Sequence, residues 1–330
     1  MKKVIWGVLS TANIAIKKVI PAMQQSSWCE IRAIASRSAD KAHKAADTLG
    51  ITHAYGSYQE LLADSEIEAI YNPLPNHLHV PLTLQAAAAG KHVLCEKPIA
   101  LNHHEAEQLL AAANKVKIME AFMVRFHPQW QRVRELISSG HIGTPRAVQV
   151  FFSFFNDNPR DVRNQAMIGG GALYDIGCYA ILAGRFMFAA KAKRAIALID
   201  RDPNFGIDRT SSGIVDFGEG RQLSFTVSTQ ADNYQLMQVH GSKGRIELAI
   251  PFNPQSETRI LIADHETQIG DPLKVEIIPK CDQYTLQGEA FSRAIRGEIE
   301  LPYDVNDAIQ NMRIIDALFR SEQSGTWETC

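Results

Sequence analysis

The tripeptide Glu96-Lys97-Pro98 directly follows the apolar run 93–95, where a buried parallel strand is expected to end. In open α/β sheets the carboxyl ends of the strands form the ligand sites. Proline supplies no N–H to a strand ladder and biases Lys97 toward an extended conformation, so we expect its ammonium group at the strand tip. A lysine there can face a cofactor, although the same residues also fit a surface turn with a salt bridge.

A second segment, 169–179, combines a glycine run with polar residues that could do chemistry. Three glycines lead as a flexible turn into a helix that is expected to continue to about residue 188. Asp175 and Tyr179 are four residues apart and therefore share one face of this helix. The alternative interpretation is a plain loop followed by a core aromatic residue whose hydroxyl reaches water.

The elements that must position Lys97 begin with a strand over 4–9, a turn of small residues over 10–12 and a helix over 14–25. Strand, tight turn and helix form the first unit of a Rossmann fold. Its glycine fingerprint is degraded here to the run 7–12, but small side chains still allow backbone N–H groups to approach a pyrophosphate. The expected contacts to a dinucleotide in this segment are Gly7, Ser10, Thr11, Ala12, Asn13 and Ile14.

The expected second strand, 31–35, ends in Ser36 and Arg37, without the carboxylate that would bind the ribose 2′-hydroxyl of NAD. A hydroxyl and a guanidinium, with Lys41 one helical turn later, suit a 2′-phosphate instead. We therefore expect NADP as the cofactor rather than NAD. The alternative is that Arg37 and Lys41 form only the solvated start of a helix.

The alternation continues with helices over 58–64, 80–90 and 102–114 and with strands over 69–71, 91–95 and 118–121. The loop 72–79 is expected at the same sheet edge as the first turn and Lys97. The pair His77 and His79 lacks further ligands at a metal spacing, so no metal site is predicted. Further contacts to the cofactor are expected from Leu74, Asn76, His79, Glu96, Lys97 and Arg125.

The charge of the chain excludes several classes of partner. Its 330 residues contain 34 Lys plus Arg and 36 Asp plus Glu, which gives a formal net charge of −2. This balance argues against nucleic acid or an anionic membrane as the main partner. The five widely spaced cysteines form no disulfide pattern, which favours a reducing, cytoplasmic location. The apolar run at the start is too short for a signal peptide, and we expect no later segment to span a membrane.

Long strand-like runs replace the alternation after residue 145, at 147–155, 211–217, 223–228, 236–240, 245–249 and 259–263. This pattern predicts a large, open-faced and mainly antiparallel sheet in an α+β domain. The chain is long enough for two cores. We expect a dinucleotide-binding α/β domain over 1–122 and a substrate and dimerisation domain over 123–330.

Taken together, the Rossmann start, the Glu-Lys-Pro segment and the later Gly-Gly-Gly-Ala-Leu-x-Asp-Ile-Gly-x-Tyr resemble the Gfo/Idh/MocA oxidoreductase family over essentially the whole chain. The nearest branch holds dimeric dihydrodiol dehydrogenases, glucose-fructose oxidoreductases and 1,5-anhydrofructose reductases. The resemblance implies Lys97, Asp175 and Tyr179 as catalytic and substrate-binding residues. Arg163 and Tyr284 are similar to positions beside the nicotinamide or the substrate. It also implies a homodimer through the sheet and a C-terminal helix, from 284–297 and 304–320, that packs back on the first domain.

The expected activity is NADP-dependent hydride transfer at a sugar, a sugar derivative or a vicinal diol, with Tyr179 as acid/base. An unperturbed tyrosine has a pKa of about 10, and an adjacent Lys97 ammonium would favour the phenolate. Asp175 would orient Lys97 or a sugar hydroxyl. Two alternatives stay open, which are a non-catalytic NADP sensor and a sugar–sugar oxidoreductase that keeps NADP bound. The segment 122–125 lacks the tryptophan of some dihydrodiol dehydrogenases, which leaves the substrate open.

Overall fold

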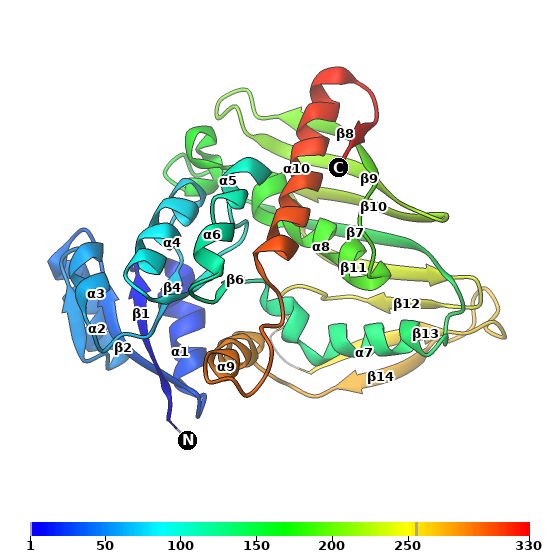
Figure 1. Ribbon diagram of the computed structural model, residues 1–330. Coiled ribbons are helices and arrows are strands. Elements are labelled where there is room, and N and C mark those ends of the chain that lie inside the picture. Colours follow the sequence, from blue (N-terminus) through cyan, green and yellow to red (C-terminus); the bar gives the residue numbers. More distant parts are fainter. Residues whose placement is uncertain (1, 255–256) are drawn as a thin grey trace. The chain divides into compact units, whose positions relative to one another are not determined.

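The computed structural model describes residues 2–254 and 257–330. The chain divides into two compact units, each of which is assembled from two stretches of sequence. Unit 1 holds Met1–Met123 and Asp282–Met312, and unit 2 holds Val124–Cys281 and Arg313–Cys330. Figure 1 labels the elements of both.

Unit 1 contains a six-stranded parallel sheet in the order β3-β2-β1-β4-β5-β6. The strand order reverses between β1 and β4, and in doubly wound sheets a dinucleotide binds at this point. The predicted strands are present, and β3 was not predicted. The bounds are β1 (Val4–Leu9), β2 (Cys29–Ala35), β3 (His53–Tyr55), β4 (Ala69–Asn72), β5 (His92–Cys95) and β6 (Ile118–Glu120).

The helices of unit 1 begin at well-defined caps, because the side chains of Ser38, Ser57 and Asn102 accept bonds from the first turns of α2, α3 and α5. The single helix predicted over 102–114 is wrong, since α5 ends at Glu107 and α6 starts at Leu110. The bounds are η1 (Ala15–Val19), α1 (Ile20–Gln24), α2 (Ala39–Leu49), α3 (Tyr58–Ala63), η2 (Asn76–Leu78), α4 (His79–Ala88), α5 (His103–Glu107), α6 (Leu110–Ala113) and α9 (Gln283–Ile295), and η3 (Met123–Phe126) lies mostly in unit 2.

Helix α9 completes the core of unit 1 although it lies near the C-terminal end of the sequence. The indole Nε1 of Trp6 donates to Ser292 Oγ at 3.1 Å, and the ring of Phe291 packs 5.6 Å from the Trp6 ring. Thr285 Oγ1 donates to the carbonyl of Ala22 at 2.8 Å. These buried contacts join β1 and α1 to residues that are more than 260 positions away in the chain.

Unit 2 contains a nine-stranded sheet in the order β14-β13-β12-β11-β7-β10-β9-β8-β15. All neighbours are antiparallel except β7 and β10, which run parallel, as expected for a mainly antiparallel sheet. Strands β8, β14 and β15 were not predicted. The bounds are β7 (Pro145–Phe155), β8 (Arg194–Arg201), β9 (Asp208–Gly218), β10 (Arg221–Ser228), β11 (Gln230–Gly241), β12 (Arg245–Leu248), β13 (Thr258–Ala263), β14 (Lys274–Ile278) and β15 (Glu328–Thr329).

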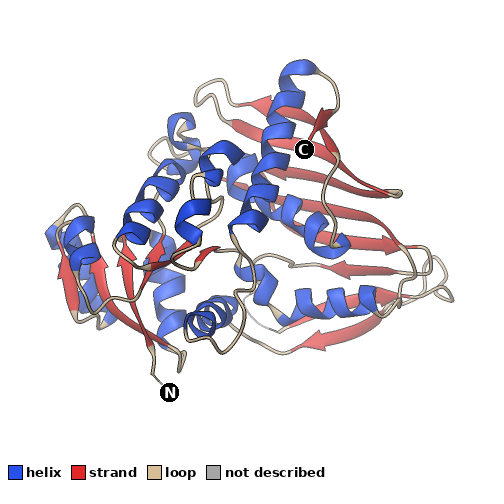
Figure 2. Cartoon of the chain, in the orientation of Figure 1, coloured by secondary structure: helices blue, strands red, loops and turns tan. Residues whose placement is uncertain are grey.

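One face of this sheet is covered by helices. Helix α8 (Cys178–Phe188) packs on β7 and β10, and α7 (Pro128–Ser138) packs on α8 and β13 (Figure 2). Alternate residues such as Val148, Val150 and Phe225 point into the core beneath these helices. The remaining elements of unit 2 are η4 (Val162–Asn164), η5 (Ala166–Ile168) and η6 (Leu173–Gly177), and α10 (Val305–Ser324) belongs in part to each unit.

One helical stretch, Ala166–Phe188, is long and apolar enough to cross a membrane by length and composition alone. This match rests on length and composition alone, so it does not overturn the expectation that no later segment spans a membrane. In the structure 72% of its most apolar window is buried, and α8 packs against β7 and β10. Its apolar character is that of a core helix, since a helix that is hydrophobic all round is buried.

Candidate functional site

The turn after β1 starts at Ser10, as the predicted strand over 4–9 and turn over 10–12 require. Ser10 has a φ of +98°, a left-handed conformation that side chains rarely adopt, and its N–H donates to Ala35 O at 2.7 Å. Gly7 lies inside the strand, paired with Ala33 and Ile70. A Cβ atom on Gly7 would lie 2.7 Å from Leu61 Cδ2. Close packing inside β1 therefore accounts for glycine at position 7 without a contact to a dinucleotide.

The segment 10–15 has the spacing of the glycine fingerprint, with Ser10, Ala12 and Ala15 in the three glycine places. Ala15 is fully buried in the first turn of η1, where a small residue allows close packing of helix and strand. Ala15 was not predicted, because the glycine fingerprint was aligned to start at Gly7. This segment therefore lies where small residues fit a pyrophosphate. Asn13 is exposed, and the half-buried residues are Ser10, Thr11, Ala12 and Ile14.

A cationic turn follows β2. Ser36 is buried, and its Oγ accepts from the N–H of Ser38, which in turn caps α2. Arg37 and Lys41 are exposed. Burial raises the pKa of the Tyr58 hydroxyl, and Arg37 beside it partly offsets that rise. The turn thus offers hydroxyl and cationic groups together, with Ser38 and Tyr58 as members that the sequence analysis missed.

His79 ties two loops together at the carboxyl ends of the strands. Its ring Nδ1 lies 2.6 Å from Pro98 O, and its Nε2 lies 2.6 Å from Leu74 O. Burial, more than any neighbour, lowers the pKa of His79 to about 4, so the ring is neutral near pH 7. Because both ring nitrogens face backbone carbonyls, His79 holds the loops rather than offering a nitrogen to a cofactor.

Asn72, at the end of β4, supports the same loop. It is fully buried, its Nδ2 donates to His79 O at 3.1 Å, and its Oδ1 accepts from the N–H of Leu74 at 3.4 Å. Leu74 is itself buried, and Asn76 is half-buried at the start of η2. Asn72 was not predicted, although an amide residue at the end of a buried strand is a signal for a residue that supports the following loop.

Glu96 and Lys97 follow β5 as predicted, and both are half-buried. The hydroxyl of Tyr71 donates to Glu96 Oε1 at 2.6 Å, and the N–H of Lys97 donates to Glu96 Oε2 at 3.3 Å. Burial, and then the negative charge of Glu96, raise the pKa of the Tyr284 hydroxyl. Tyr284 therefore lies in the electrostatic field of the Glu-Lys-Pro segment and remains a protonated hydroxyl near neutral pH.

In unit 2 the structure joins Arg163 to Asp175. The Nε atom of Arg163 donates to Asp175 Oδ2 at 2.7 Å, and its Nη1 donates to Asp161 Oδ1 at 3.2 Å. The charge of Asp175 is the first cause that raises the pKa of Arg163. Asp175 was expected to orient Lys97 or a sugar hydroxyl. In the structure its Oδ2 atom already accepts a hydrogen bond from Arg163 of the same unit.

Tyr179 lies one turn beyond Asp175, in the first turn of α8. Only 6% of the residue is exposed, and its ring packs 6.2 Å from Phe152 and 5.6 Å from Phe252. An aromatic wall of this kind excludes water from the ring and fixes its direction. Tyr179 is therefore rigidly held by the core beneath it.

The glycine run 169–171 is a packed turn, and its description as flexible is wrong. A Cβ atom on Gly170 would lie 2.5 Å from Arg163 O. The N–H of Gly171 donates to that same oxygen at 2.9 Å, and Gly171 has a φ of +122°. Close backbone approach and a left-handed conformation therefore require glycine here.

Arg125 is 3% exposed in η3, and its carbonyl accepts a hydrogen bond from Gln131 Nε2.

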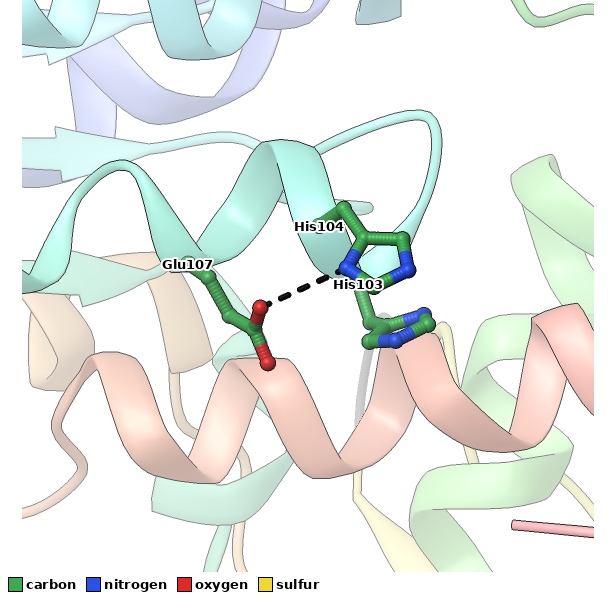
Figure 3. A group of neighbouring side chains, drawn as sticks. All are labelled: His103, His104 and Glu107. Atoms are coloured by element: carbon green, nitrogen blue, oxygen red, sulfur yellow. Dashed lines mark ion pairs between the residues drawn. The ribbon is translucent and has the colours of Figure 1, made fainter.

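A cluster of possible metal ligands lies on α5, where His103, His104 and Glu107 offer ligand atoms within 4.8 Å of one another. Figure 3 shows His104 directed toward Glu107, with Nδ1 and Oε2 3.5 Å apart. Among the described residues the group offers three ligand atoms from one helix of five residues, and a structural zinc site has four ligands. We assign this group no function.

Two family models match the chain. Residues 5–126 match the oxidoreductase family with an NAD-binding Rossmann fold, and residues 130–247 match the GFO/IDH/MocA C-terminal domain. An uncharacterized oxidoreductase of Rhizobium meliloti is 44% identical over 100% of both chains. A D-xylose 1-dehydrogenase (NADP(+)) of Haloferax volcanii is 36% identical over 97% of this chain and 98% of its own.

Solved structures show the same fold over the full length. A 3-ketoreductase from Actinomadura kijaniata in complex with NADP and TDP-benzene has a TM-score of 0.90 and 28% identity, and the match covers 97% of this chain and 98% of that one. An aldose-aldose oxidoreductase from Caulobacter crescentus has a TM-score of 0.91 and 26% identity over 100% of both chains. The chain is therefore an oxidoreductase and belongs to the GFO/IDH/MocA family, as its motifs predicted.

Proposed function

We propose that this oxidoreductase uses NADP to transfer hydride to or from a CH–OH carbon of a sugar, a sugar derivative or another vicinal diol. The observation that carries the proposal is the set of polar groups at the carboxyl ends of β1, β2, β4 and β5, around the reversal of strand order. The activities of relatives support the substrate class, since these include the D-xylose 1-dehydrogenase and a trans-1,2-dihydrobenzene-1,2-diol dehydrogenase of Xenopus laevis that is 34% identical over 82% of both chains.

The residues of unit 1 fit NADP. Small residues surround the first N–H groups of η1, where a pyrophosphate is bound in folds of this type. The turn with Ser36, Arg37 and Lys41 fits the 2′-phosphate through charged hydrogen bonds. The 3-ketoreductase with a similar structure is in complex with NADP. When bound, NADP supplies the hydride chemistry, and the protein supplies position and electrostatics.

We assign Tyr179 as the acid/base. When a hydroxyl is oxidised its proton must be accepted, and when a carbonyl is reduced the new alkoxide must be protonated, so one positioned group serves both directions. Lys97 assists by favouring the phenolate through its positive charge. Asp175, held by Arg163, orients a substrate hydroxyl or the Lys97 ammonium group. The A. kijaniata 3-ketoreductase has also been solved with a lysine replaced by alanine and with a tyrosine replaced by phenylalanine.

A second candidate reaction is hydride exchange between two sugars on a cofactor that stays bound. The full-length similarity to the aldose-aldose oxidoreductase favours it. Both reactions use the same acid/base residue, and they differ in whether the nucleotide leaves after each turnover. The nucleotide content of the purified protein therefore distinguishes them.

The test is single-turnover and steady-state oxidation of NADPH with a panel of aldoses, ketoses, osones and diols, on protein whose nucleotide content is first measured after gel filtration. We expect turnover with at least one compound. Lys97→Met and Tyr179→Phe are expected to keep NADPH binding and to lose about 10²- to 10⁴-fold in kcat, the usual contribution of general acid/base catalysis. The exposed residues Lys115 and Tyr234 provide matched controls as Lys115→Met and Tyr234→Phe.

Each result has a defined meaning. Near-full activity of both site variants would defeat the assignment of Lys97 and Tyr179 while leaving the oxidoreductase reaction in place. The absence of turnover with every compound in the panel would defeat the proposed substrate class. Stoichiometric NADP(H) after gel filtration, with hydride passed from one sugar to another, would favour the second candidate.

The proposed oligomer is a homodimer formed through the face of the nine-stranded sheet that α7 and α8 do not cover. Side chains on this face form a shallow apolar depression across β7 to β11 that includes Phe151, Ile196, Leu198, Ile214 and Leu236. Leu198 is 79% and Ile214 is 41% exposed. A second copy would present the same apolar rows, which is what an isologous interface requires. Apart from a second copy of this chain, the small-molecule substrate is the only partner that we propose.

A further inference from the structure

The helical segment that carries Asp175 and Tyr179 has no cap of its own. It begins at Leu173 and continues as α8 to Phe188, and its N-cap residue, Ala172, has no polar side chain. The first N–H groups of a helix need outside partners, and they favour a negative charge. Asp208, at the start of β9, supplies both, since its Oδ2 accepts from the N–H of Leu173 at 2.7 Å.

Asp208 is held as firmly as the helix that it caps. Only 1% of the residue is exposed, and the same Oδ2 accepts from Ser211 Oγ at 2.9 Å. Burial raises the pKa of Asp208 to about 6, against the bonds from Leu173 and Ser211 and the positive charge of Arg201. A buried carboxylate that lost these partners would be left with an uncompensated charge, so its position is strongly specified.

Gly171 connects Asp208 to the residues of the candidate site. A Cβ atom on Gly171 would lie 1.8 Å from Asp208 Oδ1, so the carboxylate rests directly against the backbone at this point. The carbonyl of Gly171 accepts from the N–H of Asp175 at 3.1 Å, and its N–H donates to Arg163 O. A shift of the Asp208 carboxylate would therefore move the turn that holds both members of the Arg163–Asp175 pair.

We propose that Asp208 is a positioning residue that sets the place of Asp175 and Tyr179 by capping their helix from β9. It touches neither the substrate nor the reacting atoms. The proposal rests on the proposed function for its kinetic consequence but not for its structural one. Because misplacement by about 1 Å can cost about 10²-fold in rate, a small movement of this helix is enough to affect catalysis.

The test compares Asp208→Asn with the exposed control Asp200→Asn, in the full chain. We expect hydrogen exchange of the backbone amides 173–179 to accelerate in Asp208→Asn only, because the neutral amide is a weaker cap. We expect kcat to fall by about 10- to 100-fold, with the dissociation constant for NADPH within about twofold, since the residues proposed to bind NADP lie in unit 1. Thermal unfolding verifies that the assayed protein is folded.

A second pair of variants approaches the same contact from the other side. Gly171→Ala is expected to reproduce the faster exchange and the lower kcat. Gly206→Ala is the matched control, because Gly206 also has a positive φ, of +69°, but has nothing within 4 Å of an added Cβ. If folded Asp208→Asn and Gly171→Ala retain wild-type exchange at 173–179, the proposal is overturned whether or not the enzyme turns over. If exchange accelerates while the wild type turns over no compound, the cap stands and the proposed function fails.

Discussion

Arg37 is the residue on which the choice of cofactor depends most directly. It is the exposed guanidinium in the turn after β2, beside the hydroxyl of Tyr58 and after the buried hydroxyl of Ser36. No carboxylate precedes Asp40 in this turn, so a ribose 2′-hydroxyl would find no negative acceptor there. A 2′-phosphate would find a charged donor, and such bonds are geometrically specific for guanidinium groups.

We therefore expect Arg37→Ala to weaken NADPH binding by about 10- to 100-fold, because a hydrogen bond to a charged group contributes about 1.5–3 kcal/mol. NADH binding should change by less than about twofold, since NADH has no 2′-phosphate. Fluorescence titration of both nucleotides measures the ratio. Lys44→Ala removes an exposed charge from α2, the helix that follows this turn, and is the control. Equal losses for the two nucleotides would contradict the role of Arg37.

For single residues, the sequence predicted which residues belong to the candidate site better than it predicted which side chains they contact. Lys97, Asp175 and Tyr179 could be selected because their order and spacing follow a family pattern. The pair formed by Arg163 and Asp175 could not, because the two residues are twelve positions apart and the pair depends on how the chain folds back through short helical turns. The reason for glycine at position 7 could not be read from residue type alone, because close packing and phosphate binding both select glycine.

Two loops at the ends of β4 and β5 act as one element because His79 bridges them. The neutral ring carries one N–H and donates to one of the two carbonyls at a time. A protonated ring could donate to both, but burial outweighs that gain and lowers the pKa of His79 to about 4 from 6.5. The folded protein therefore binds fewer protons at His79 than the unfolded chain does between these two pH values.

The consequence is a stability that depends on pH, with a defined sign. The contribution of neutral His79 is fully present above pH 6.5 and is lost as the pH falls toward 4. The pKa difference corresponds to a loss on the order of 3 kcal/mol. His79→Gln should unfold more easily at pH 7.5 and should show a smaller loss of stability on acidification, as measured by urea unfolding at several pH values. Parallel acid profiles for the two proteins would contradict this account.

Elements with a strong local pattern were predicted well, and those set by tertiary contacts were not. Strand β1 has the predicted bounds, because an apolar run between polar residues is decisive for a buried strand. Helix α7, with the polar sequence of a half-exposed helix, was not predicted. The break between α5 and α6 lies within an alanine-rich stretch of high helix propensity, so tertiary context decides where each helix ends.

For the whole molecule, the uncovered sheet face predicts the oligomeric state. Leu198→Glu places a charge in the centre of the proposed interface, where desolvation would be costly. We expect the wild type to elute at twice 36.6 kDa in size-exclusion chromatography with light scattering, and the variant at 36.6 kDa. Leu110→Glu, at an exposed position on α6 of unit 1, is the control. A wild type that stays monomeric at high concentration would contradict the dimer.

The fold class and the two-part organisation could be predicted because the switch from alternating elements to long strands is visible in the sequence. Only the family resemblance implied that α9 returns to the first unit, and the contacts that hold it there, such as that of Trp6 with Ser292, could not be predicted from a local pattern. The same holds for the parallel pair of β7 and β10, because pairing direction is set by the path of the chain between them.

The return of α9 to the first unit has a consequence for biosynthesis. Trp6 is among the first residues to leave the ribosome, whereas Phe291 and Ser292, which cover its ring, are among the last. At about 5–20 residues per second, β1 would wait about 15 to 60 s for this cover. During that interval the apolar surface around Trp6, which α9 later covers, is available to chaperones or to other nascent chains. Slow translation of the second unit is therefore expected to favour aggregation of the first.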